Sequence, residues 1–388
     1  MNRALYALFT SIISERFAFY QFLCLYSLYQ ISLGVPERVS TRTVAGIISS
    51  VYGATFLGGL LGQRLGFRWV ALAGAMLVAA AYSALALGAP PLAWGAALAA
   101  GIGCYKPCMP ILVSLASDCH KAMPRFYACV NVGGFLGPLI GGLFAAAGMF
   151  HPAFAVSAAA ALVAGAALSA GWGELSRADE EFRIRQALAV DVAEGAERGR
   201  WAAIVAMCLV SVCFWTPYQA FFGLVEHIIE TGVDRRILGA VMPTAWFNAE
   251  NGLIILLAGA LAAGAFREWS ALRRFLGALL LTGLSFLLMV VGGWKGGKMH
   301  LLFPAVAVFV ETVGEIMLSP LGLSKIARVA PARHVGLCAA LWYLSMSAGG
   351  WLSGLSSSLW YFVAFSAGGL VLLACSRRQF RLLDDLSR

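Results

Sequence analysis

The run Trp201–Val225 reads WAAIVAMCLVSVCFWTPYQAFFGLV and contains no Asp, Glu, Lys or Arg. Two further runs, Phe275–Trp294 and Trp69–Tyr105, share this property. The hydrocarbon core of a bilayer takes about 20 apolar residues per helix. Backbone polar groups cannot stay unpaired in hydrocarbon, so such runs must be helices. We therefore predict an all-α membrane protein.

The composition of the whole chain supports this prediction. Hydrophobic residues make up 60% of the sequence and charged residues only 12%, whereas a soluble domain carries about 25% charged residues. Lipid must therefore cover part of the surface, and the bilayer is the first expected partner.

The same pattern continues along the chain and predicts twelve transmembrane helices. One long charged connection, residues 174–200, separates an N-terminal six-helix bundle (1–173) from a C-terminal six-helix bundle with a short tail (201–388). We expect this connection to be a solvated cytoplasmic linker. The predicted helices are centred near residues 18, 53, 78, 104, 138, 162, 213, 251, 284, 312, 345 and 367.

Basic residues predict the orientation. Lys and Arg gather in the segments that the prediction places on the same side of the membrane as both termini. Examples are Arg64, Arg68, Lys121, Arg377 and Arg378. Cytoplasmic loops carry such an excess, so we expect both termini in the cytoplasm and a multi-pass protein of a bacterial inner membrane. The net charge of +9 is then a signal for membrane insertion, and a nucleic-acid partner is not expected.

Several charged residues fall inside predicted helices, where charge is costly and marks functional sites. Both halves contribute, and both signs are present. A cavity with cations from the N-terminal half and an acid from the C-terminal half suits a zwitterionic substrate, bound near the midplane. These residues are Glu15, Arg16, Lys106, Glu250, Glu311 and Glu315.

A simpler interpretation is that these charges only pair with one another and hold helices together. For Glu250 and Glu311 both interpretations stay open. No metal site is predicted, because Cys104 and Cys108 lie one helical turn apart without a His or carboxylate to complete a ligand set.

Five segments resemble the proton-dependent oligopeptide transporter family of the major facilitator superfamily, in the family's order from the first helix to the eleventh. The loop GLLGQRLGFR (59–68) also resembles the general facilitator loop, with Gln63 in place of its aspartate. The five segments are SERFAFY (14–20), GIGCYKP (101–107), RFYACVNVGGFLGPLI (125–140), PTAWFNAENGLIILL (243–257) and VGEIMLSPLGLSKIARVAPARHVGLCAALWYL (313–344).

The resemblance implies a secondary active transporter that takes up di- and tripeptides with protons by alternating access. It implies a monomer with no cofactor, no metal and no catalytic residues, driven by the proton gradient. Membership also implies the major facilitator fold of two six-helix bundles.

The resemblance also implies roles for individual residues. Arg16 and Lys106 would hold the peptide carboxylate, Asn131 would hydrogen-bond the peptide, and Asn251 and Glu315 would receive its ammonium. Aromatic pocket walls are expected at Tyr20, Tyr29, Trp215, Tyr218 and Trp342, although interhelical packing is a plain alternative for Tyr29 and Trp215. The proton-coupling set is Glu15, Arg16, Lys106 and Glu315.

The sequence departs from the family at two acids associated with proton movement. Ile12 and Gln219 stand at their positions, and neither side chain exchanges a proton near neutral pH. The acid of the seventh helix that the family places near Lys106 is therefore absent. Glu311 lies one turn before Glu315, so we add it to the proton-coupling set and predict that the two acids share the missing role.

The departures keep other functions open. The chain could be a major facilitator carrier for another small solute, such as an amino acid, nitrate or a drug, or a facilitator that has lost proton coupling. A sensor or scaffold is less favoured, because the short connections leave no soluble domain. An enzyme is not expected, because no hydrolase or metalloprotease motif appears.

Overall fold

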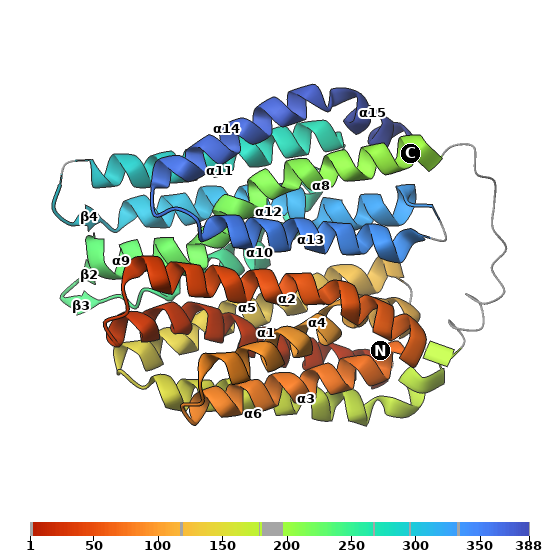
Figure 1. The fold of residues 1–388 in the computed structure, drawn as a ribbon, viewed down its shortest axis with the longest axis horizontal. Helices are drawn as coiled ribbons and strands as arrows, with labels where there is room; N and C mark the ends of the chain where they lie inside the picture. Colours follow the sequence, from red (N-terminus) through yellow and green to blue (C-terminus); the bar gives the residue numbers. More distant parts are fainter. Residues whose placement is uncertain are drawn as a thin grey trace. The chain divides into compact units, whose positions relative to one another are not determined.

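The computed structural model describes residues 3–116, 119–177, 179–180, 197–266, 268–294, 296–331 and 334–387. The described chain is almost entirely helical (Figure 1). The prediction for the middle of the linker, residues 181–196, falls outside the described residues.

Six long helices come from the N-terminal half. Short turns connect them, and Gly34, Gly66, Gly88 and Gly148 adopt positive φ in these turns, which glycine does without strain. The helices are α1 (Arg3–Ser32), α2 (Glu37–Leu65), α3 (Phe67–Ala86), α4 (Pro91–Ala116), α5 (Cys119–Ala146) and α6 (Phe150–Ala170).

The C-terminal half contains six more long helices, with a few short elements. The long helices are α8 (Glu197–Ala220), α10 (Trp246–Ala265), α11 (Ala271–Gly293), α12 (Leu302–Val329), α13 (Val335–Ser353) and α14 (Leu359–Cys375). The short elements are a π-helical turn, η2 (Phe221–Val225), the helices α9 (Glu226–Gly232) and α15 (Arg377–Asp385), and the strands β1 (Val233–Asp234), β2 (Arg236–Ile237), β3 (Ala240–Val241) and β4 (Met299–His300).

Each predicted helix centre falls inside one of these long helices. By length and hydropathy, eight helical stretches of the described chain suffice to cross a membrane, and the pair α14 and α15, bent by 68°, is a ninth. The all-helical fold is thus as predicted.

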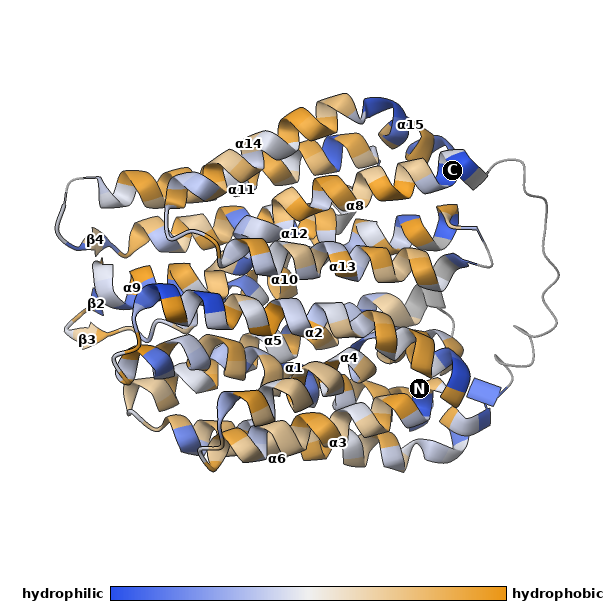
Figure 2. Cartoon of the chain, in the orientation of Figure 1, coloured by the Kyte–Doolittle hydropathy of each residue, from blue (hydrophilic) through white to orange (hydrophobic). Residues whose placement is uncertain are grey.

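The surface of the long helices is suited to lipid. In Figure 2 the helices are coloured mainly as apolar, and the strongly hydrophilic residues gather near their ends. Large apolar side chains are exposed in the middle of several helices, such as Leu257 of α10 at 72% and Leu280 of α11 at 52%. Such exposure is costly in water and favourable in hydrocarbon.

The chain forms two compact units. The first comprises residues 1–29 and 50–190, and the second comprises residues 30–49 and 191–388. The first part of α2 therefore belongs with the C-terminal helices: the Ser347 hydroxyl donates to the Ser49 carbonyl oxygen at 2.7 Å, and His227 Nε2 lies 3.7 Å from a Glu37 carboxylate oxygen. The prediction from the sequence instead includes residues 30–49 in the N-terminal bundle, residues 1–173.

Small residues bring α5 close to α1 in the first unit. A Cβ atom added at Gly133 would lie 2.6 Å from Arg16 Cβ and 2.7 Å from the Ile13 carbonyl oxygen. Helices pack closely in membranes through such small residues. This contact fixes the part of α1 that carries Arg16.

We predict that G133A lowers the free energy of unfolding by about 1–3 kcal/mol, because the added methyl group meets backbone atoms that cannot move aside. Gly59 of α2 is the matched control, because a Cβ there meets nothing within 4 Å. G59A should keep or raise stability, since alanine favours helix. Equal stability of the two variants in detergent unfolding would contradict the close contact.

Candidate functional site

In the first unit, Arg16 is paired with its neighbour Glu15. Arg16 Nε and Nη2 each donate to a different Glu15 carboxylate oxygen at 2.5 Å, and both residues are buried. The guanidinium also lies over the Phe19 ring, 4.9 Å from its centroid. Arg16 is thus held in a bidentate ion pair.

Lys106 lies on α4 in the same unit. Its ammonium is 3.6 Å from the centroid of the Tyr52 ring on α2. A cation over an aromatic face is stabilised by the ring's quadrupole. This contact does not neutralise the ammonium, because the ring carries no net charge.

The other predicted residues of this unit take separate positions. Asn131 donates through Nδ2 to the Tyr127 carbonyl oxygen of its own helix at 2.8 Å. Tyr20 packs edge-on against Phe19. Tyr29 packs on Phe150, His151 and Phe154 of α6, about 20 Å along α1 from Arg16 at 1.5 Å per residue. Packing is therefore the interpretation that the structure favours for Tyr29.

In the second unit, Glu315 of α12 is held by neutral hydrogen-bond donors. Asn251 of α10 donates through Nδ2 to Glu315 Oε2 at 2.9 Å and to Thr312 Oγ1 at 3.0 Å. Tyr218 of α8 also hydrogen-bonds Glu315. The structure thus brings together three predicted site residues from three helices.

Glu311 lies one turn before Glu315, on α12, and contacts a different helix. Ser285 and Thr282 of α11 donate to its two carboxylate oxygens at 3.0 and 3.2 Å. Glu311 and Glu315 are 3% and 9% exposed. Neither acid makes an ion pair with any residue that the structure describes.

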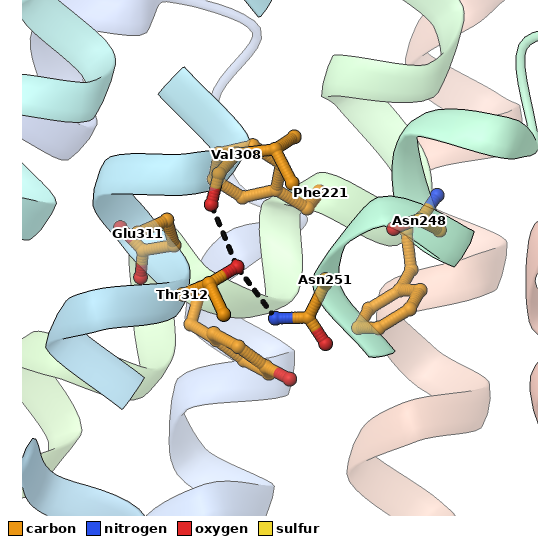
Figure 3. Close-up of a pocket in the computed structure, with 8 residues that line it drawn as sticks. Phe221, Asn248, Asn251, Val308, Glu311 and Thr312 are labelled. Carbon is orange, nitrogen blue, oxygen red and sulfur yellow. Dashed lines mark hydrogen bonds between the residues drawn. The ribbon is translucent and has the colours of Figure 1, made fainter. Parts of the chain in front are cut away.

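A small cavity adjoins Glu311 (Figure 3). It offers about 20 Å³ of space for water, and polar side chains of α10 and α12 and aromatic rings line it. In Figure 3 the Asn251 amide reaches from α10 to Thr312 on α12. The lining residues are Tyr218, Phe221, Phe222, Asn248, Asn251, Val308, Glu311 and Thr312.

Trp215 and Trp342 form an aromatic corner in the second unit. Their rings meet edge to face at 6.1 Å, and Tyr218 packs on Trp215 at 5.3 Å. Nearby, Gln219 donates through Nε2 to the Met346 carbonyl oxygen of α13 at 2.8 Å. The amide that stands in place of the family's acid thus joins α8 to α13.

Sequence reasoning did not single out the buried acid Glu226, which lies next to the cavity. It is 1% exposed, and Asn248 of α10, a cavity-lining residue, donates to its Oε1 at 2.8 Å. Glu226 directly follows the apolar run that ends at Val225, so it was not among the charged residues found inside predicted helices. The π-helical turn η2 just before it has no reliable sequence signal.

Comparison with protein families identifies the class of protein. The profile of the Major Facilitator Superfamily matches residues 2–355. Since this range covers most of the chain, the chain belongs to the major facilitator superfamily.

Individual relatives indicate which family of this superfamily the chain resembles. The chain is 24% identical to dipeptide and tripeptide permease A of Pectobacterium carotovorum, over 91% of this chain and 82% of that protein. It is 23% identical to a peptide transporter of Yersinia enterocolitica, over 90% and 86%. The resemblance to the oligopeptide transporter family is thereby confirmed.

Solved structures share the fold. The crystal structure of a peptide transporter, POT, in complex with sulfate matches with a TM-score of 0.86 at 22% identity, over 100% of this chain and 96% of the other. A POT family transporter in complex with 5-aminolevulinic acid matches with a TM-score of 0.84 at 18% identity, over 99% and 97%.

The ion pair in the first unit leads to a prediction on stability. E15Q leaves a buried guanidinium that cannot lose its proton, so we expect it to lower the free energy of unfolding by about 3 kcal/mol or more. R16Q should cost less, because Glu15 can take up a proton. The double variant E15Q/R16Q should be more stable than E15Q.

These free energies are measurable by unfolding in mixed micelles with increasing dodecyl sulfate. Additive losses in the double variant would contradict an energetically coupled pair.

Proposed function

We propose that this protein is a secondary active transporter that takes up di- and tripeptides together with protons by alternating access. All twelve long helices then cross the inner membrane, with both termini in the cytoplasm, and the monomer is the working unit. The named functions of the relatives support peptides as the substrate class, and the basic residues support the orientation.

The observation that carries this proposal is the distribution of buried charge. The first unit holds the buried pair of Arg16 and Glu15 and, on α4, the half-buried Lys106. The second holds Glu311 and Glu315 among neutral donors. A buried carboxylate is costly until a proton or a cation neutralises it. A peptide ammonium at Glu315 supplies that cation, and its carboxylate suits Arg16 and Lys106.

Glu15 governs how much of Arg16 the substrate can use. While Glu15 is ionised, it occupies two donors of the guanidinium. A proton on Glu15 turns this ion pair into a weaker charge–dipole contact, and those donors become available to a peptide carboxylate. Proton uptake and substrate binding are therefore coupled through one side chain.

In the second unit, we assign the binding of the transported proton to Glu311 and Glu315. The two acids lie one turn apart, so their negative charges repel each other when both are ionised. When a peptide ammonium occupies Glu315, the charge on that acid is compensated. Glu311 has only neutral hydrogen-bond donors in the described chain. A proton that binds to its carboxylate therefore neutralises its charge.

Uptake by purified protein in liposomes tests the proposal. We predict that an acidic outside medium drives the accumulation of radiolabelled dialanine. K106A and E315Q should each reduce this uptake about tenfold or more, because each removes a charge-assisted contact to the peptide. Absence of any peptide-dependent flux in the native protein would contradict the proposal.

A second prediction concerns Glu311 alone. E311Q keeps a side chain of the same shape, whose amide oxygen can accept from one of the hydroxyls of Ser285 and Thr282 and whose NH2 group can donate to the other, but it cannot exchange a proton. We expect gradient-driven uptake to fall about tenfold or more and its pH profile to flatten, while exchange of labelled for unlabelled peptide without a gradient persists. An unchanged pH profile would show that Glu311 has no part in coupling.

One observation favours a second candidate function, a facilitator without proton coupling. Ile12 is buried and apolar, and the Gln219 amide is engaged with the backbone of α13, so neither position handles protons. The same liposomes discriminate the two functions: peptide entry that stops at equal concentrations and ignores the pH gradient identifies a facilitator.

A further inference from the structure

The buried carboxyl group of Glu226 has no role in the mechanism above. It lies in the first turn of α9, at the end of the C-terminal unit opposite α15 (Figure 1). Its exposed fraction is 1%, so its position within the helical bundle is as sheltered as that of Glu311. A buried acid inside a membrane protein is expensive and by default functional.

The geometry of α8 explains why this acid is turned inward. In a regular helix each residue advances by about 100°, so residues 219 and 226 would lie almost on one face. The five-residue π-helical turn η2 lies between them. An extra residue in such a turn rotates everything after it by about one residue step. Glu226 consequently meets α10 through Asn248.

Asn248 connects Glu226 to the cavity. Its Nδ2 atom donates to Glu226 Oε1 at 2.8 Å, and its side chain lines the cavity that Glu311 also lines (Figure 3). The cavity is small, with about 20 Å³ of space for water, which suffices for about one water molecule. A proton path from Glu226 to Glu311 therefore needs to pass only Asn248 and about one cavity water.

Other charged groups gather at this end of the unit. His227 follows Glu226 and lies 3.7 Å from the Glu37 carboxylate. Glu230, one turn further along α9, is paired with Arg235 at 2.8 Å and accepts from Thr244. These groups are partly exposed, so protons from the medium reach this end of the helix.

We propose that Glu226 is the proton-relay residue through which a proton enters the C-terminal unit and reaches Glu311. The Glu226 carboxylate binds a proton from the medium and becomes the neutral acid. It then gives this proton through cavity water to the Glu311 carboxylate, and Glu226 returns to its ionised form. This inference rests on the proposed proton-coupled function, and it gives α8–α9 the acid that position 219 lacks.

The test is E226Q in proteoliposomes, with three measurements. Gradient-driven dipeptide uptake should fall about tenfold or more, and its dependence on outside pH should be lost. Exchange of labelled for unlabelled dipeptide at equal pH should persist, because that reaction moves no net proton. E226D, which keeps a carboxyl group, should restore part of the driven uptake.

The matched control is E230Q, on the same helix one turn away. Glu230 is partly exposed and already paired with Arg235, and such surface pairs contribute little. Its driven uptake should stay within about twofold of the native value.

Each outcome decides the matter. Native driven uptake in E226Q would overturn the relay, as would equal loss of driven uptake and exchange, since that marks a structural role. Native vesicles that transport peptide with no response to the pH gradient would instead refute the proton-coupled function itself.

Discussion

The cost of a charge that is held away from water governs this molecule. Apolar helices supply most of the sequence, so each ionisable group within them must find a partner, a proton or a ligand. The two units meet this requirement in different ways. In the first, an acid and a guanidinium neutralise each other and an ammonium lies on an aromatic ring. In the second, carboxylates are surrounded by hydroxyl and amide donors.

This difference has a chemical meaning. Neutral donors orient a carboxylate and stabilise its charge in part, but they do not cancel it. Glu311 and Glu315 therefore retain affinity for a proton or for the ammonium of a substrate. In the proposed function, the ammonium of a peptide neutralises Glu315, and its carboxylate binds Arg16 and Lys106.

Much of this organisation was predictable, because helices and buried charges leave direct marks in the sequence. The apolar pattern placed a predicted centre inside every long helix, and the rarity of charge within these segments singled out Arg16, Lys106, Glu311 and Glu315. Side-chain partners were not predictable in this way. The pairing of Arg16 with Glu15 and the packing of Tyr29 against α6 depend on how helices pack. Glu226 escaped notice because a π-helical turn, which has no compositional signature, sets its direction.

The central claim is that Glu315 binds the substrate ammonium, and binding of capped peptides to purified protein tests it most directly. Dissociation constants for dialanine and N-acetyl-dialanine should be measured by calorimetry with native protein and with E315Q. The account predicts that the acetyl cap weakens binding to the native protein by about tenfold or more and has little effect on E315Q, where the carboxylate is already gone. An equal penalty for the cap in both proteins would contradict it.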